Sequence, residues 1–148
     1  MSGSEGYLGI KNVEVAEVWR RLEQEPEAVL IDVRTHAEWT FVGIPDLTKL
    51  GKELVTIEWQ GFPEGQVNPF FAEQLDAELV RNGVKKDASI FFICRSGVRS
   101  LHAAQVMAKE GYRCCHNVAA GFEGSQDKSR QRGALGGWKA AGLPWIQS

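Results

Sequence analysis

The chain has 148 residues, a length typical of one domain, with 43% hydrophobic and 24% charged residues. This composition excludes a wholly disordered, collagen-like or coiled-coil protein. The 17 basic and 19 acidic residues give a net charge of -2, so we expect no nucleic-acid partner. No apolar run reaches about 18 residues and the N-terminus lacks a signal-peptide pattern, so we expect no membrane association. Three cysteines, two of them adjacent, make a poor disulfide framework and favour the cytoplasm.

The first half of the chain predicts one long helix and two clear strands. Tyr7–Ile10 is a weak strand candidate, and helical spacing of apolar residues predicts a helix over Val13–Gln24 with Asn12 as its N-cap. A continuous apolar run predicts a buried strand over Val29–Val33. The alternating pattern of Glu53–Trp59 indicates a strand nearer the edge of a sheet.

The second half continues the alternation of helices and strands. Helices are predicted over Phe70–Arg81 and over Val98–Glu110, with Val98 on the buried stripe of the latter. The strongest strand pattern is Ser89–Ile93, and Tyr112–Val118 is a further candidate, weakened by the polar residues His116 and Asn117. A short last helix is predicted over Leu135–Ala141.

This order of elements predicts an α/β fold with a mainly parallel central sheet and helices on both faces. We expect residues 1–148 to form a single domain with its core between about residues 10 and 145. The polar segment 124–133 is predicted to be a surface loop within that domain.

The segment with the most chemistry is Cys94-Arg95-Ser96-Gly97-Val98-Arg99-Ser100, which lies between a predicted strand and a predicted helix. Ligands of parallel α/β sheets bind at the carboxyl ends of strands, and the N–H groups that begin a helix have no intrahelical partner. A tight turn at Gly97 could direct such N–H groups at the cysteine sulfur, and Ser100 could donate a further hydrogen bond. The pattern therefore predicts an anion-stabilising loop around Cys94.

Two arginines strengthen this interpretation over that of a buried structural cysteine. The thiolate is the reactive form of cysteine. One arginine about 5 Å from it contributes about 3 kcal/mol at an effective dielectric of about 20, before screening. A helix N-terminus contributes at most about 2 kcal/mol. Either Arg95 or Arg99 could therefore outweigh the helix dipole in stabilising a thiolate on Cys94.

The loop Cys94–Arg99 resembles the active-site loop of the rhodanese (sulfurtransferase) family at each of its six positions. Further similarity extends from about Ile10 to Trp145 and includes Ile31-Asp32-Val33-Arg34 and Val118-Ala119-Ala120-Gly121-Phe122. The resemblance implies a rhodanese-like fold. It also implies transfer of a sulfane sulfur through a persulfide on Cys94, with residues 95–100 as the substrate- and persulfide-binding loop.

Two positions depart from the family pattern. Val42-Gly43-Ile44-Pro45 stands where the family usually has Gly-His-Ile-Pro, and Ala120 replaces the first of two glycines in the second signature, Val118–Phe122. Both lie away from the cysteine loop along the sequence, so we interpret them as changes in packing or turns. They leave the conformation of residues 40–52 without a firm prediction.

Two alternatives to a sulfurtransferase stay open on the residues alone. Related cysteine phosphatases place five residues between cysteine and arginine, whereas four residues separate Cys94 from Arg99 and give a narrower ring. No aspartate lies within the loop as a general acid, which also favours sulfur over phosphate. A non-catalytic binding or sulfur-carrier module on the same fold is the second alternative.

The resemblance implies small-molecule partners: a sulfur donor, and a cyanide or thiol acceptor that could be a protein thiol. Arginine at the second loop position accompanies thiosulfate use in the family, so Arg95 favours thiosulfate over mercaptopyruvate. A dianion also gains about twice as much as a monoanion from one fixed positive charge. We expect no organic cofactor and no metal, because His36, His102 and His116 lack metal-ligand spacing with the cysteines.

Other candidates have structural explanations. Asp32 and Arg34 could support the loop, but a structural ion pair at a strand end is slightly preferred. Thr35 and Glu38 have capping-box spacing, which predicts a short helix. Cys114 and Cys115 could resolve a persulfide, but we expect them to fill a strand. The three histidines are expected at the surface or at caps. The tryptophans are expected in packing, although Trp59-Gln60-Gly61-Phe62 could line the substrate cleft.

Overall fold

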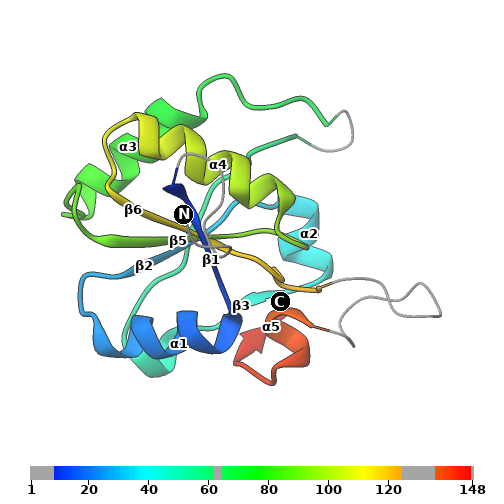
Figure 1. Ribbon diagram of the computed structural model, residues 1–148. Helices are drawn as coiled ribbons and strands as arrows, with labels where there is room; N and C mark the ends of the chain where they lie inside the picture. The colour runs from blue at the N-terminus through cyan, green and yellow to red at the C-terminus, as the bar shows by residue number, and fades with distance from the viewer. Residues whose placement is uncertain (1–8, 62–64, 125–135, 148) are drawn as a thin grey trace.

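The computed structural model describes residues 9–61, 65–124 and 136–147 (Figure 1). Its main sheet has five parallel strands in the order β1-β6-β5-β2-β4. In that order they are β1 (Lys11–Val13), β6 (Cys114–Val118), β5 (Ser89–Ile93), β2 (Val29–Asp32) and β4 (Val55–Thr56). A second, antiparallel pair joins β3 (Ile44–Pro45) to β7 (Trp145–Ile146). The prediction of a mainly parallel central sheet is confirmed.

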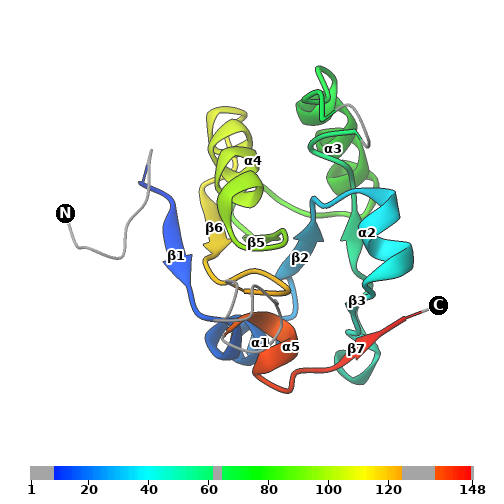
Figure 2. The same cartoon turned by 90° about the vertical axis from the view of Figure 1, so that its right-hand side faces the viewer.

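Helices cover both faces of the sheet, as the alternating pattern predicted. Figure 2 shows α1 (Val15–Gln24) and α5 (Gly137–Ala140) on one side, and α3 (Phe71–Arg81) and α4 (Val98–Lys109) on the other. The short helix α2 (His36–Phe41) follows β2, and a 3-10 turn, η2 (Thr48–Leu50), precedes β4. Within residues 40–52 the chain therefore forms the end of α2, β3 and η2.

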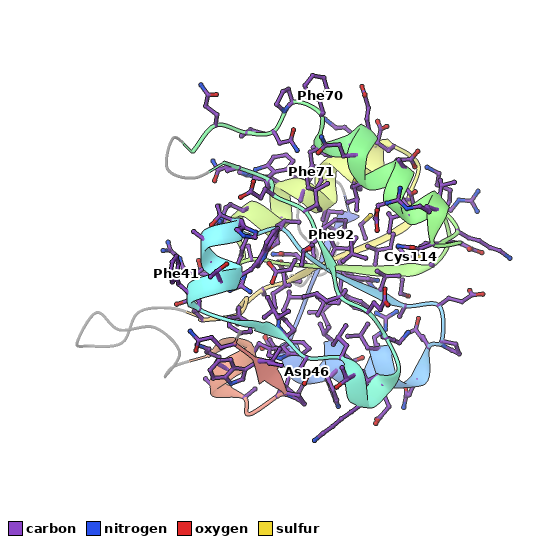
Figure 3. All side chains as sticks on the ribbon, turned by 180° about the vertical axis from the view of Figure 1, so that it is seen from behind. Phe41, Asp46, Phe70, Phe71, Phe92 and Cys114 are labelled. Atoms are coloured by element: carbon purple, nitrogen blue, oxygen red, sulfur yellow. The ribbon has the colours of Figure 1, made fainter. Side chains whose placement is uncertain are left out.

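The central strand β5 is buried on both faces because its side chains alternate between two apolar layers. Ile90 and Phe92 pack with α3 and α4, whereas Phe91 and Ile93 pack with α1 and α5. Figure 3 shows Phe71 of α3 and Phe92 of β5 in the interior, whereas Phe70 lies at the surface. Each such side chain contributes about 1.5–3 kcal/mol when fully buried. This packing fixes the end of β5, where Cys94 follows.

The N-terminal elements differ from the prediction. Strand β1 is Lys11–Val13, so the weak candidate Tyr7–Ile10 is wrong for Gly9 and Ile10, and its first two residues lie outside the described part. Glu14, not Asn12, is the N-cap of α1, and it makes no side-chain capping hydrogen bond. Asn12 belongs to β1 and its side chain accepts a hydrogen bond from Asn117 at 2.9 Å. The strand pairing of β1 with β6 therefore outweighs the capping preference of asparagine.

Two other predicted elements are shorter than expected. Only Val55–Thr56 forms regular strand β4 within the predicted Glu53–Trp59, although the N–H of Ile57 and that of Trp59 still donate to the carbonyls of Asp32 and Val33. Helix α5 begins at Gly137, and Leu135 lies outside the described residues. So do residues 125–133 of the predicted polar loop.

Helix α4 exposes Val98, contrary to the predicted buried stripe. Its side chain is 63% exposed, whereas Ser100, Ala103, Ala104 and Met107 are buried. The buried face begins at a serine because that serine lies beside the sulfur of Cys94. A hydrophobic pattern could not show this, because the buried residue is polar.

Candidate active site

Cys94 follows β5 and lies within a ring of hydrogen-bonding groups. Its Sγ accepts the backbone N–H of Gly97 at 3.2 Å and that of Ser100 at 3.4 Å. The Ser100 hydroxyl lies 3.1 Å from the same sulfur, and Cys94 is only 1% exposed. Gly97 is the N-cap of α4 with φ of 106°, a left-handed conformation that favours glycine. The expected anion-stabilising geometry is present at the end of β5.

The turn at residues 119–124 packs directly against this loop. A Cβ on Gly97 would lie 2.2 Å from the carbonyl oxygen of Ala119, and one on Gly121 would lie 2.5 Å from that of Arg95. The N–H of Phe122 donates to the Cys94 carbonyl at 2.8 Å. Ala120, the second departure from the family pattern, precedes Gly121 in this turn, so it is distant from the cysteine loop only along the sequence. Backbone contact at two glycines makes the loop and this turn one unit.

Arg99 pairs with Glu38 of α2 instead of pointing freely at the cavity. Its Nη1 and Nη2 donate to the two carboxylate oxygens at 2.7 and 2.9 Å, and both side chains are largely buried. Burial alone would raise the pKa of Glu38, but hydrogen bonds from Arg99 and from the Thr35 backbone bring it below its usual value. Burial opposes the charge of Arg99, yet Glu38 keeps the pKa of the guanidinium above its ordinary value. The positive charge of Arg99 is thus compensated at the site.

Glu38 also completes the predicted capping box. Its backbone N–H donates to Thr35 Oγ1 at 3.2 Å, and its carboxylate accepts the Thr35 N–H at 3.1 Å. The capping explanation is confirmed for Glu38 but incomplete. One carboxylate fixes the start of α2 and, across 61 residues of sequence, the start of α4. Sequence spacing alone offered no indication of the second contact.

Asp32 and Arg34 form the buried ion pair that was slightly preferred on sequence grounds. Both side chains are fully buried, with Arg34 Nη2 2.7 Å from an Asp32 carboxylate oxygen. The same nitrogen donates to the Gly43 carbonyl at 2.7 Å, and the guanidinium lies 4.3 Å from the centre of the Phe122 ring. Arg34 therefore links the turn after α2 to the turn that supports the cysteine loop.

A cavity of about 570 Å³ opens beside the loop. Its walls come from α2, the segment after Trp59, the cysteine loop and the turn at residues 119–124, and they include Gln60, Gly61, Arg95, Arg99 and Glu123. Arg95 is exposed and lines this cavity. Gln60 and Gly61 lie in the wall, whereas Trp59 is buried in the core and Phe62 lies outside the described residues. Figure 3 shows Phe41, which also lines the cavity, on the outer side of α2.

A larger cavity of about 660 Å³ lies between β4 and α3 and is not the candidate site. None of the cysteine-loop residues lines it. Its Lys52 is already bound: Nζ donates to the carbonyls of Glu25, Pro26 and Ala28 at 2.8–3.0 Å. This lysine ties the segment before β4 to the end of α1.

The structure adds one site residue that the sequence interpretation missed. Asn117 of β6 accepts a hydrogen bond from Ser100 Oγ at 2.6 Å and donates to the Gly97 carbonyl at 3.0 Å. A polar residue inside a buried strand was the available indication. In the sequence alone such a residue only weakens the pattern of a strand, because its hydrogen-bond partners come from other elements.

The remaining cysteines and histidines lie elsewhere. Cys114 and Cys115 occupy β6 as expected, and all three cysteines are free. His116 is 8% exposed, so its expected surface position is wrong, whereas His36 and His102 are exposed. In the described part of the chain, no group of three or more His, Cys, Asp and Glu residues could hold a metal ion. Among the same residues, no helix has the length and apolarity required to span a bilayer.

Comparison with known proteins identifies the family. Residues 9–148 match the family model described as STR4 middle domain. The chain is 37% identical over 139 residues to protein RC0915 of Rickettsia conorii, covering 93% of this chain and 98% of that protein. It is 24% identical over 137 residues to a protein named sulfurtransferase from Allochromatium vinosum, covering 93% and 95%.

Solved structures of related proteins have the same fold. The crystal structure of Rv0390 from M. tuberculosis superposes with a TM-score of 0.82 at 42% identity, covering 93% of this chain and 97% of that one. A rhodanese-related protein from Thermoplasma volcanium superposes with a TM-score of 0.52 at 15% identity, covering 93% and 98%, and shows the shared fold. The predicted resemblance is confirmed: this chain belongs to the STR4 middle-domain family of rhodanese-like proteins.

Proposed function

We propose that this protein transfers a sulfane sulfur from a donor such as thiosulfate to a thiophilic acceptor through a persulfide on Cys94. The observation that carries the proposal is the set of hydrogen-bonding groups around Sγ: two backbone N–H donors at 3.2 and 3.4 Å and a hydroxyl at 3.1 Å. Such donors stabilise a sulfur anion at the end of a parallel strand. The Allochromatium relative named sulfurtransferase supports the same class of reaction.

The reaction divides into two steps. The Cys94 thiolate attacks the outer sulfur of thiosulfate, a new S–S bond forms, and the old S–S bond breaks with its electron pair leaving on sulfite. An acceptor thiolate or cyanide then attacks the outer sulfur of the persulfide. The Cys94–S bond breaks and its electron pair returns to Cys94, so the first and last states of the protein are identical. Both steps use a stabilised sulfur anion, and we propose that no metal or organic cofactor takes part.

Arg95 is the residue we propose for donor recognition. Arg99 has its charge compensated by Glu38, whereas Arg95 is exposed at the cavity and no described carboxylate forms an ion pair with it. A fixed positive charge attracts dianionic thiosulfate about twice as strongly as monoanionic mercaptopyruvate. We therefore propose thiosulfate as the preferred of these two donors.

Phosphate transfer is the less favoured chemistry. A cysteine phosphatase needs its loop arginine on the phosphate, but both ends of the Arg99 guanidinium are held by Glu38 at 2.7 and 2.9 Å. A non-catalytic carrier module on the same fold differs from the enzyme only in turnover. For the acceptor we propose a small thiol, cyanide or a protein thiol. Three free cysteines fit a reducing, cytoplasmic setting.

The proposal is tested by intact-protein mass spectrometry after incubation with thiosulfate. The mass should rise by one sulfur and return on addition of cyanide or a thiol. Cys94→Ser should lose this gain, whereas the matched control Cys114→Ser should keep it. A gain that persists in Cys94→Ser contradicts the proposal, and one that forms but never turns over identifies a carrier module. Release of phosphate from an aryl phosphate without sulfur uptake would instead identify a phosphatase.

A further inference from the structure

A chain of side-chain hydrogen bonds connects the sulfur of Cys94 to the edge strand β1. It runs from Sγ to Ser100 Oγ at 3.1 Å, then to Asn117 Oδ1 at 2.6 Å. The amide nitrogen of Asn117 continues it to Asn12 Oδ1 at 2.9 Å. Asn12 and Asn117 are direct partners in the pairing of β1 with β6, so the two strands place them together.

The neighbours of Asn117 fix the orientation of its amide. Nδ2 donates to the Gly97 carbonyl at 3.0 Å, and a carbonyl can only accept a hydrogen bond. The amide group facing Gly97 must therefore be NH2, and its second hydrogen is taken by Asn12. Oδ1 is left facing Ser100, at a residue that is only 3% exposed.

This orientation decides what the Ser100 hydroxyl can do. The hydroxyl has one hydrogen, and Oδ1 of Asn117 is an acceptor without a hydrogen to give. When that hydrogen points at Asn117, a lone pair of Ser100 Oγ faces the sulfur and can accept a hydrogen bond from a protonated Cys94. A thiolate has no hydrogen, so the same lone pair would face a negative charge.

We propose that Asn117 is a positioning residue that competes with the sulfur of Cys94 for the single hydroxyl hydrogen of Ser100. In the thiol state the hydrogen lies on the Asn117 side. When the thiol loses its proton to solvent, the Ser100 hydroxyl rotates and donates to the thiolate, while the Gly97 and Ser100 N–H donors stay fixed. When a persulfide forms, the negative charge moves to the outer sulfur and the hydrogen returns to Asn117.

This competition gives Cys94 a third donor only while it carries a charge. A permanent third donor would stabilise the thiolate further, but a stabilised thiolate is a weaker nucleophile. The inference rests on the proposed function only in taking Cys94 as the reacting thiol. It assigns to Asn117 an effect on the ionisation of the Cys94 thiol, which a residue that only holds the loop in shape would not have.

The charged groups around the loop are unchanged by the variants that test this. They come from the loop itself, from β2 and its end, from α2 and from the turn at residues 119–124: Arg95, Arg99, Asp32, Arg34, Glu38 and Glu123. Substitutions of Asn117 and Ser100 exchange neutral side chains, so a change in the pH profile cannot come from a changed number of charges.

The experiment measures the rate of alkylation by iodoacetamide against pH, followed by mass spectrometry on the peptide that contains Cys94. Asn117→Ala frees the hydroxyl hydrogen for the sulfur, so half-maximal alkylation should move to lower pH. Ser100→Ala removes the hydroxyl, so it should move to higher pH. Each shift should be about half a pH unit to one unit, the size expected for one hydrogen bond. The double variant should behave as Ser100→Ala does.

Two outcomes overturn the inference. A shift to higher pH in Asn117→Ala would show that Asn117 only holds the loop in shape, because loosened N–H donors stabilise the thiolate less. A shift to lower pH in Ser100→Ala would show that the hydroxyl never turns toward the sulfur. Failure of the proposed function is distinct: Cys94 would then accept no sulfur from thiosulfate, whatever its alkylation profile.

Two controls accompany these variants. Asn12→Ala removes only the outer anchor of the amide and leaves the Gly97 contact, so its profile should match that of the parent protein. Asn117→Val also removes the acceptor but keeps a side chain that suits a buried strand. It should reproduce the shift of Asn117→Ala if the smaller variant folds poorly. Circular dichroism establishes that each variant is folded.

Discussion

The cysteine loop and the middle of β6 both bury potentially reactive side chains, but the two regions differ in the hydrogen-bond partners that they provide. Cys94 is 1% exposed, Cys115 5% and His116 8%. At the loop, two N–H groups and a hydroxyl lie within 3.4 Å of the sulfur. In β6, Cys115 donates weakly to the Tyr112 carbonyl at 3.5 Å, and neither His116 nitrogen has a partner among the described residues.

The consequence in β6 is that both groups are neutral near pH 7. Burial raises the pKa of the Cys115 thiol to about 12. Burial, with the nearby charges of Arg21 and Lys11, lowers the pKa of His116 to about 4. Burial by itself therefore makes a cysteine or histidine inert. The backbone donors at the end of β5 are the feature that distinguishes the loop.

The largest expected effect tests this contrast between thiols. Cys94→Ser should lower the rate of sulfur transfer from thiosulfate by at least about a thousandfold, because the nucleophile is lost. Cys115→Ser should keep the rate within about threefold of the parent, since a protonated, buried thiol takes no part. Steady-state assays with cyanide as acceptor measure both variants. A comparable loss in the two would remove the distinction between the regions.

The next effect concerns charge at the cavity. Arg95→Ala should lower kcat/KM for thiosulfate by about tenfold to a hundredfold, with a smaller loss for a monoanionic donor. High salt should raise the KM of the parent for thiosulfate, because salt screens an exposed charge. Arg113→Ala removes another exposed arginine and serves as the control. Equal losses for every donor would mean that Arg95 shapes the loop instead of recognising charge.

The buried histidine of β6 should make stability depend on pH. Its pKa is about 4 in the folded protein and about 6.5 when unfolded, so the unfolded state binds more protons between these values. The free energy of unfolding should therefore decrease as the pH falls from about 6.5 towards 4, by about 2–3 kcal/mol. Urea titrations at several pH values measure this dependence.

Two variants separate His116 from other titrating groups. His116→Phe removes the titration and keeps an aromatic ring against Phe91, whose centre lies 4.9 Å away, so the decrease should become shallower. His36→Gln changes an exposed histidine and should leave the decrease as in the parent. An unchanged slope in His116→Phe would show that the histidine is not held neutral.

The smallest effect separates the two loop arginines. Glu38→Gln removes the charge that compensates Arg99, so kcat/KM for thiosulfate should rise about threefold to tenfold at low ionic strength. Thr35→Val weakens the same helix cap without changing charge and should give no such rise. A decrease in Glu38→Gln beyond that in Thr35→Val would show that the ion pair serves the geometry of the loop.

The sequence was sufficient for those features whose causes are local. Strands β2 and β5 were predicted because both faces of these strands are buried, and α1 and α3 because their apolar stripes recur at helical spacing. Cys94 was expected at the junction of a strand and a helix, where it lies. The capping box at Thr35 was also recognisable, since it joins residues three apart.

Features that depend on distant contacts were not predictable. The partner of Arg99 lies 61 positions earlier, and Glu38 already had a sufficient local explanation. Val98 was expected to be buried because it is apolar, but the position facing the sulfur belongs to Ser100. Asn117 looked like a flaw in a strand because its partners come from β1 and α4. In each case the contacts of a polar side chain are determined by elements that are distant in the sequence.

The contact between Gly97, Gly121 and the neighbouring carbonyls also bears on how the site could diverge or be engineered. The sulfur of Cys94 is bound largely by backbone N–H groups, which a substitution can alter only by moving the main chain. A side chain at Gly97 or Gly121 would collide with a carbonyl group, so we expect a substitution at either glycine to abolish activity instead of tuning it. The cavity wall is made of side chains such as Gln60, Arg95 and Glu123, which can vary one at a time. New donor preferences are therefore best sought in libraries that vary this wall and leave the two glycines untouched.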